Sequence, residues 1–188
     1  MKYSLLFRIW HWLNALVVIA LVFTVWLRWT FLSKNTNADI LTDKLFDMDI
    51  DITQSQAIVL SKAIRSGMWD WHIYLGYMFL ALVLFRAVLY FKDSSIKEKF
   101  NDLNLHYKIV RISYYILYTS FFVMLVSGLL VHFYKDLGLT RDLAHTIKEV
   151  HEIVYYYIVY FIPLHIIGVF IAENTDKNGL VSSMINGK

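Results

Sequence analysis

Four long apolar segments constrain the fold of this 188-residue chain more than any other feature of its sequence. They comprise residues 9–32, 69–91, 112–134 and 150–172. Each is long enough, at about 1.5 Å per residue, to cross a hydrocarbon layer about 30 Å thick as an α-helix. Apart from Arg86, the few charged residues inside them lie near a segment end, from which a side chain can reach water. The sequence therefore predicts four membrane-spanning helices.

The composition and the positions of the aromatic residues support a single helical bundle. Hydrophobic residues make up 58% of the chain and charged residues 18%, a balance typical of membrane proteins. Tryptophans and tyrosines gather near the segment ends, as in the aromatic belts at membrane–water interfaces. We therefore predict an all-α fold, in which one membrane domain, residues 1–188, forms an up-and-down transmembrane four-helix bundle with a long outer connection at 33–68.

This long connection divides into two parts by composition. Its first part is acidic, and we interpret it as a solvated loop, with a docking surface for a basic electron-transfer partner as the alternative. The second part, residues 53–65, has apolar residues at spacings that predict a short surface helix.

The distribution of lysine and arginine predicts the orientation in the membrane. The N-terminal piece, the second connection and the C-terminal tail hold a small excess of these residues on short segments, which favours a cytoplasmic location for both termini. The first apolar segment is longer than that of a cleaved signal peptide, and no small-residue cleavage site follows it. We therefore expect this segment to remain in the membrane.

Two features of the composition exclude whole classes of function. Because the chain has no cysteine, it can have no disulfide, thiolate-bound cluster, cysteine nucleophile or thioether-attached haem. Its net charge of +3 is scattered over short connections, which argues against nucleic acid as a partner. A redox cofactor in this chain must therefore be held by other ligands, and histidine is the first candidate.

Five of the seven histidines lie in the apolar segments, and four of these lie at depths that match in pairs. His11, His72 and His151 open the first, second and fourth segments, and His165 lies deep in the fourth. The fourteen residues from His151 to His165 correspond to about 21 Å of rise and nearly four full turns, so both side chains project from one face. Since successive spans run in opposite directions, His11 shares a level with His165, and His72 shares a level with His151. The sequence predicts two bis-histidine sites, one in each leaflet.

A pair of facing histidines suits the iron of a haem. Porphyrin iron has two axial positions on opposite faces, whereas zinc usually takes a third or fourth protein ligand. We therefore predict two haems in the bundle core, with His11 and His165 binding one iron and His72 and His151 the other. His132 is an alternative ligand because it shares the outer level, while His106 and His145 are expected at the surface.

Glycines accompany the predicted ligands. Gly76 follows His72 by one turn, Gly168 follows His165 closely, and Gly128 lies within the third segment. A missing side chain there would let a flat macrocycle approach the backbone. Ordinary helix packing explains small residues in membrane spans equally well.

Three arginines could bind the propionates of a haem. Arg8 lies three residues before His11, and Arg86 and Arg111 lie near the predicted cytoplasmic ends of their spans. A planar guanidinium suits a carboxylate, which makes all three candidates at the inner haem. Anchoring of the spans by the positive-inside rule explains them equally well.

Three short patterns together resemble a known family. Arg8-Ile9-Trp10-His11-Trp12 opens the first span, Trp71-His72 with Gly76 opens the second, and His151-Glu152 precedes His165 by fourteen residues. They resemble the bacterial cytochrome b561 family, which includes the b-type subunits of nickel–iron hydrogenases and of formate dehydrogenase. The resemblance extends over essentially the whole chain and carries the iron ligands over to the same four histidines.

The resemblance implies an electron-transfer function in the bacterial inner membrane. It implies a four-helix di-haem b cytochrome that moves electrons between a quinone pool and a partner protein, such as a c-type cytochrome or a dehydrogenase or hydrogenase subunit. Quinone and partner come from the resemblance alone, and we identify no catalytic residue. A quinone pocket beside the inner haem would have Glu173, Asp176 and His106 as candidate proton carriers.

Two alternatives to electron transfer remain open. A membrane anchor subunit with structural haem would keep the same four ligands. A histidine-based metal transporter would need inward carboxylates or methionines in several spans, and the mid-membrane residues here are mostly aliphatic and aromatic.

Overall fold

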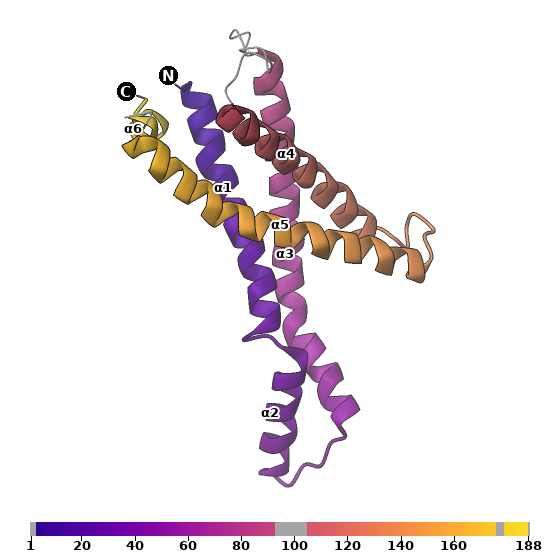
Figure 1. The fold of residues 1–188 in the computed structure, drawn as a ribbon. Helices are drawn as coiled ribbons and strands as arrows, with labels where there is room; N and C mark the ends of the chain where they lie inside the picture. Colours follow the sequence, from indigo (N-terminus) through magenta and orange to yellow (C-terminus); the bar gives the residue numbers. More distant parts are fainter. Residues whose placement is uncertain (1–2, 93–104, 176–178, 188) are drawn as a thin grey trace. The chain divides into compact units, whose positions relative to one another are not determined.

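A computed structural model of the chain describes residues 3–92, 105–175 and 179–187. These residues form helices joined by short turns, and they contain no strand. The helices are α1 Leu5–Trp29, α2 Lys34–Phe46, α3 Gln54–Lys92, α4 Leu105–His132, α5 Arg141–Asn174 and α6 Leu180–Ile185 (Figure 1).

Four of the helices, α1, α3, α4 and α5, are long and apolar enough to cross a membrane. Each contains most of one predicted span, although the helices begin four to fifteen residues before the predicted spans. The prediction of an all-α membrane protein with four spanning helices is therefore confirmed.

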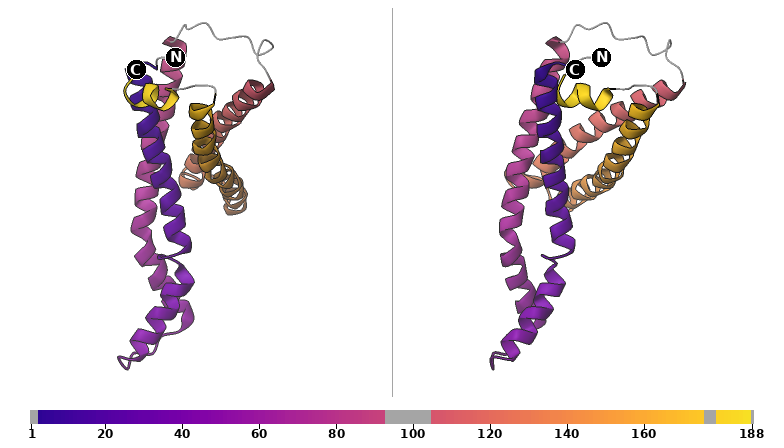
Figure 2. Two further views of the ribbon diagram at one scale, coloured as in Figure 1. Left: turned by 60° about the vertical axis from the view of Figure 1, so that its left-hand side comes forward. Right: turned by 90° about the vertical axis from the view of Figure 1, so that its left-hand side faces the viewer.

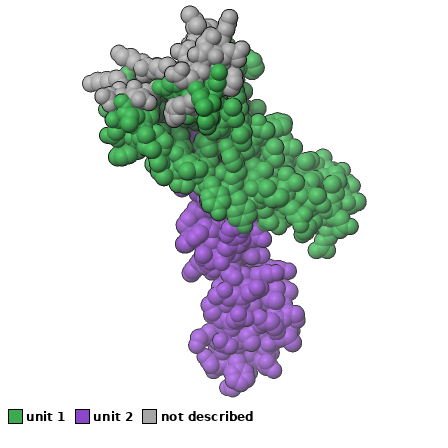
Figure 3. Space-filling view, in the orientation of Figure 1, with its two compact units in different colours: residues 1–13, 80–188 green, residues 14–79 purple. Residues whose placement is uncertain are grey.

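The helices group into two compact units (Figure 3). Unit 1 consists of Met1–Leu13 and Leu80–Lys188, and unit 2 consists of Asn14–Phe79. The helices α1 and α3 therefore each contribute residues to both units. The assignment of residues 1–188 to one membrane domain stays a prediction.

In unit 2, helix α2 lies beside the beginning of α3 (Figures 1 and 2). The side chains of Ala38, Ala57 and Ser61 are fully buried there, and such small residues allow two helices to approach closely. Gln54 joins the two helices because its amide donates to Asp39 at 2.8 Å and its carbonyl accepts from Thr42 at 3.3 Å. These contacts hold the two helices together as a hairpin.

The long connection is more helical than its composition predicts. The beginning of the acidic part, expected as a loop, is helical. Asp39 and Asp43 lie in α2, whose N-cap Ser33 accepts a hydrogen bond from the Thr36 amide at 3.5 Å, whereas the other three aspartates follow this helix. The expected short surface helix is the first part of α3 and continues into the span without a break. No proline interrupts α3, and a glycine such as Gly67 costs a helix only about 1 kcal/mol, which the neighbouring turns offset.

In unit 1, helices α4 and α5 pack against each other, as the two views of Figure 2 show. Helix α5 begins nine residues before the predicted span. Its N-cap Thr140 accepts a hydrogen bond from the Leu143 amide at 3.3 Å. Asp142 places a negative charge in the first turn, where it interacts favourably with the helix dipole and stabilises the helix. This helix continues without a break through Pro163.

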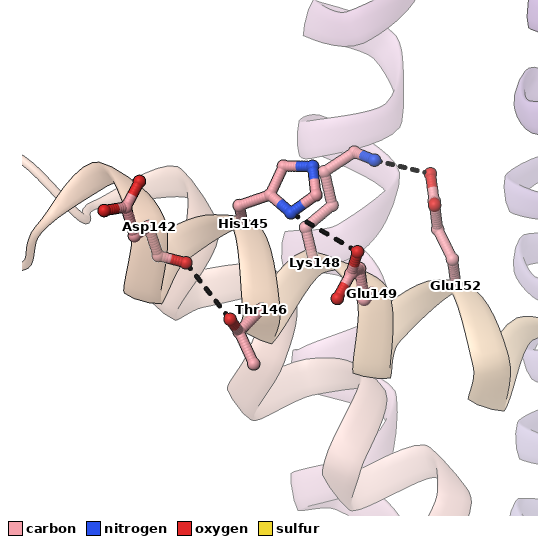
Figure 4. Close-up of polar contacts among 6 residues, drawn as sticks. All are labelled: Asp142, His145, Thr146, Lys148, Glu149 and Glu152. Carbon is pink, nitrogen blue, oxygen red and sulfur yellow. Dashed lines mark hydrogen bonds and ion pairs between the residues drawn. The ribbon is translucent and has the colours of Figure 1, made fainter.

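The first turns of α5 are polar and bear pairs of side chains one turn apart (Figure 4). Lys148 pairs with Glu152 at 2.8 Å, and His145 lies 3.4 Å from Glu149. Such pairs stabilise a helix in water by a few tenths of a kcal/mol each. The N-terminal extension of α5 is therefore held by local polar contacts.

The short helix α6 is bound to the end of α5 and to the first turns of α1. Glu173, near the end of α5, accepts hydrogen bonds from the amides of Gly179 at 2.9 Å and Val181 at 2.8 Å. At the other end of α6, Arg8 donates to the Ile185 carbonyl at 2.9 Å and the Trp12 indole donates to the Met184 carbonyl at 3.4 Å. These contacts connect the C-terminal helix with the first turns of α1.

Candidate functional site

Two of the four predicted ligands lie close together within unit 1. The imidazole rings of His11 on α1 and His165 on α5 have centroids 6.3 Å apart, with planes inclined by 57°. A metal–imidazole bond is about 2 Å long and the ring centre lies about 1 Å behind the nitrogen, so two rings on opposite sides of one metal have centroids roughly 6 Å apart. The observed separation fits an axial pair on one iron.

Aromatic rings surround this pair. Phe161, one turn before His165, stacks on its ring with centroids 5.8 Å apart and planes only 10° apart. The ring of Tyr114 on α4 is inclined by 73° to the same ring, with centroids 6.1 Å apart, and its hydroxyl lies 3.4 Å from Nδ1. The Trp12 ring meets the edge of His11 with centroids 5.4 Å apart. These rings restrict the orientation of both imidazoles and provide apolar surroundings for a macrocycle.

Two of the predicted arginines, Arg8 and Arg86, lie at the first turns of α1 in unit 1. Arg86 of α3 is held over the rings of Phe7 and Trp10, with its guanidinium carbon 5.0 and 5.3 Å from their centroids. Arg8 donates to the Ile185 carbonyl from one nitrogen, while its buried Nε has no hydrogen-bond partner among the described residues. A buried donor without a partner, one turn before His11, fits an acceptor supplied by a bound group.

Arg111 and Gly76 complete the predicted cofactor-binding residues. Arg111 lies in the second turn of α4. At Gly76 and at Gly168, a Cβ atom added to the backbone would meet no described atom within 4 Å. Neither glycine is therefore required by a close helix contact among the described residues.

His72 of α3 belongs to unit 2. Its Nδ1 lies 2.7 Å from the hydroxyl oxygen of Thr24 on α1, and this hydroxyl donates to the Leu21 carbonyl at 2.6 Å. The ring of Trp69, one turn earlier, meets the imidazole at its edge with centroids 5.6 Å apart. The His72 ring is thus oriented by a hydrogen bond with Thr24 on a neighbouring helix.

His151 of α5 belongs to unit 1 and has similar surroundings. Its Nδ1 lies 2.8 Å from the hydroxyl oxygen of Ser127 on α4, which is 2.6 Å from the Val123 carbonyl. A Cβ atom added at Gly128 would come within 3.3 Å of His151 Cε1. The absence of a side chain at Gly128 therefore provides the space that the His151 imidazole occupies.

The remaining histidines have different settings. His132 is the last residue of α4, and its ring meets Phe133 with centroids 4.5 Å apart. His145 is exposed on α5 beside Glu149. His106 is in the first turn of α4, but its side chain lies outside the described part of the chain.

Of the two other candidate proton carriers, Glu173 and Asp176, the structure describes Glu173. Both carboxylate oxygens of Glu173 accept amide hydrogens from the α6 end, so this residue has a structural role there. Asp176 lies outside the described residues.

Three residues of the site were not identified from the sequence: Thr24, Ser127 and Tyr114. The available signal was a hydroxyl group in an otherwise apolar span, at a depth close to that of a histidine on another span. Helix period alone does not show which neighbour a hydroxyl faces. The partner of each hydroxyl can therefore be identified only when the packing of the helices is known.

Comparison with protein families supports the resemblance seen in the sequence. The family model of prokaryotic cytochrome b561 matches residues 2–187. Comparisons with curated proteins and with solved structures give no match. Since the family match covers nearly the whole chain, this chain belongs to the prokaryotic cytochrome b561 family and is a multi-pass membrane protein of haem b electron transfer.

Proposed function

We propose that the protein is a di-haem b cytochrome that transfers electrons between a quinone pool and a partner redox protein, such as a c-type cytochrome or a dehydrogenase or hydrogenase subunit. The observation that carries the proposal is the 6.3 Å separation of the His11 and His165 rings, which suits the two axial ligands of one iron. Family membership supports the quinone and the partner. The proposed location is the bacterial inner membrane with both termini in the cytoplasm, in accord with the positive-inside rule.

The second haem is assigned to His72 and His151. Helix period supports this assignment, because His151 and His165 lie nearly four turns apart on one face of α5. The sequence predicts spans of alternating direction, and on this basis His72 is proposed to share a level with His151. Each of these two rings is also oriented by a hydroxyl group within its own unit.

A haem b bound by these histidines would supply one-electron transfer. The chain contributes the ligands and their orientation. Stacking by Phe161 and the edge of Tyr114 hold the His165 ring, and the apolar spans keep water away. In such surroundings a nearby charge has a larger effect on the potential than it would in water.

Arg8, Arg86 and Arg111 are proposed to bind haem propionates. The case is strongest for Arg8, whose buried Nε has no described acceptor and lies one turn from His11. Gly76 is proposed to let the macrocycle of the second haem approach α3, which agrees with the open space beside this glycine.

Haem content tests the assignment of the ligands. The purified wild-type protein in detergent should contain two haems per chain, and His165→Ala should contain one. His145→Ala is the matched control, because His145 is an exposed histidine on the same helix, and it should keep both haems. One haem or less in the wild type, or two in His165→Ala, would contradict the proposal.

The quinone step is tested separately. A short-chain quinol added to the oxidised, haem-loaded protein in vesicles should give the optical bands of reduced haem b. Dithionite serves as the control that both haems are reducible. If dithionite reduces the haems and a range of quinols does not, the quinone is not the electron donor or acceptor of this chain.

A further inference from the structure

Thr24 and Ser127 occupy equivalent places beside two histidines. Each lies on a different helix from its histidine, and its hydroxyl oxygen is within 2.8 Å of the ring Nδ1. Both are buried, with 6% and 5% of their surface exposed. A buried hydroxyl has a strong requirement for hydrogen-bond partners, because leaving it without one costs about 1–3 kcal/mol. These two contacts are therefore structural features of the site.

The single proton of each hydroxyl has a defined position. The Thr24 hydroxyl lies 2.6 Å from the Leu21 carbonyl, and the Ser127 hydroxyl lies 2.6 Å from the Val123 carbonyl. A carbonyl can only accept, so in each case the hydroxyl donates its proton to the backbone. The hydroxyl oxygen must then accept a hydrogen from the imidazole.

This arrangement selects one tautomer of each ring. If Nδ1–H donates to the hydroxyl, the lone pair of the neutral imidazole is on Nε2. A metal binds an imidazole through the lone pair, so Nε2 is then the nitrogen available for coordination. The same hydrogen bond holds the ring plane and raises the basicity of the ligand, as partners of metal-bound histidines commonly do.

We infer that Thr24 and Ser127 are positioning residues that hold His72 and His151 as Nδ1–H tautomers, with Nε2 directed to the haem iron. The inference rests on the proposed function, in which these two histidines are haem ligands. It adds two side chains on α1 and α4 to the site, one for each ligand of the second haem.

The first test observes the tautomer in protein without haem. Nitrogen-15 NMR of histidine-labelled apoprotein in lipid should show His72 and His151 as Nδ1–H tautomers in the wild type. Thr24→Val keeps the side-chain shape and Ser127→Ala removes only the hydroxyl, and each should give a mixture of tautomers at its own histidine. Thr24→Ser keeps the hydroxyl and should behave as the wild type. A wild-type tautomer in both Thr24→Val and Ser127→Ala would overturn the inference.

The second test uses the loaded protein. Thr24→Val and Ser127→Ala should weaken binding of the second haem by about 10–100-fold and raise its midpoint potential, because the ligand becomes less basic. Ser120→Ala is the matched control. Ser120 is a buried serine on α4 whose hydroxyl bonds to no histidine among the described residues. Affinity and potential equal to those of Ser120→Ala would overturn the inference.

Substitution of the ligands separates the two proposals. If His72→Ala and His151→Ala keep two haems per chain, the proposed ligand assignment is wrong. If they lose a haem while the hydroxyl variants keep the wild-type tautomer, affinity and potential, only the role of Thr24 and Ser127 is wrong. Circular dichroism of every variant checks that its helices remain folded, and Thr24→Ser gives a folded comparison for Thr24→Val.

Discussion

The four proposed ligands are oriented in two different ways. The ring of His165, which faces His11, is held by aromatic neighbours, with Phe161 stacked on it and Tyr114 at its edge. The rings of His72 and His151, which we call the hydroxyl-bonded histidines, each make a short hydrogen bond with a hydroxyl group on another helix. Stacking restricts the plane of a ring, whereas a hydrogen bond also decides which nitrogen carries the proton.

The difference has a consequence for the redox potentials. A hydrogen bond accepted from Nδ1–H makes the imidazole more basic, and a more basic ligand favours the ferric state. We therefore expect the haem bound by the hydroxyl-bonded histidines to have the lower midpoint potential. Redox titration with optical detection should resolve two components.

The largest effect is expected from loss of a ligand. His11→Ala and His165→Ala should both remove the component of higher potential, while His72→Ala and His151→Ala should both remove the other. The reason is that each iron needs both of its axial imidazoles to be held. Optical titration of the four variants checks the pairing, and loss of different components in His11→Ala and His165→Ala would show that these two residues do not share an iron.

A smaller effect is expected from removal of the stacked ring. Phe161→Ala should keep the ligand but reduce affinity for the haem of His11 and His165 by about two- to tenfold, since an aromatic pair contributes roughly 0.5–1.5 kcal/mol. Transfer of haem to an apo-globin measures the loss rate. Phe161→Leu fills part of the space and should lose haem more slowly than Phe161→Ala. Equal rates in both variants and the wild type would mean that stacking does not orient this ring.

Gly128 allows a still smaller perturbation of a hydroxyl-bonded histidine. In Gly128→Ala the new Cβ would lie 3.3 Å from His151 Cε1, so the ring must move by a few tenths of an ångström. We expect two haems per chain, with altered electron paramagnetic resonance of the low-potential haem alone. Gly67→Ala is the control because its Cβ would meet nothing within 4 Å. A spectrum identical to that of Gly67→Ala would show that His151 has more room than its contacts indicate.

The sequence predicts the spans better than it predicts the surroundings of the histidines, whose pairing stays a prediction. Long apolar segments have few alternatives in water or lipid, and the four-turn spacing of His151 and His165 is a local property of one helix. Helix α2 was not predicted because its acidic sequence is typical of a solvated loop. Its contact with α3 through Ala38 follows from tertiary packing, which the sequence of α2 alone does not reveal. Thr24 and Ser127 were missed for the same reason, because the partner of a hydroxyl depends on how two helices pack.

The smallest effect is expected at the Tyr114 hydroxyl, where the two groups of ligands resemble each other most. Its oxygen lies 3.4 Å from His165 Nδ1, beyond the usual range for a hydrogen bond, whereas the Ser127 oxygen lies 2.8 Å from His151 Nδ1. Tyr114→Phe keeps the ring and its edge contact, so the haem of His11 and His165 should keep its content and its midpoint potential. In the same titration Ser127→Ala should raise the potential of the other haem. A shift in Tyr114→Phe as large as that in Ser127→Ala would mean that His165 also depends on a hydrogen bond, and the two groups of ligands would then be oriented by the same kind of contact.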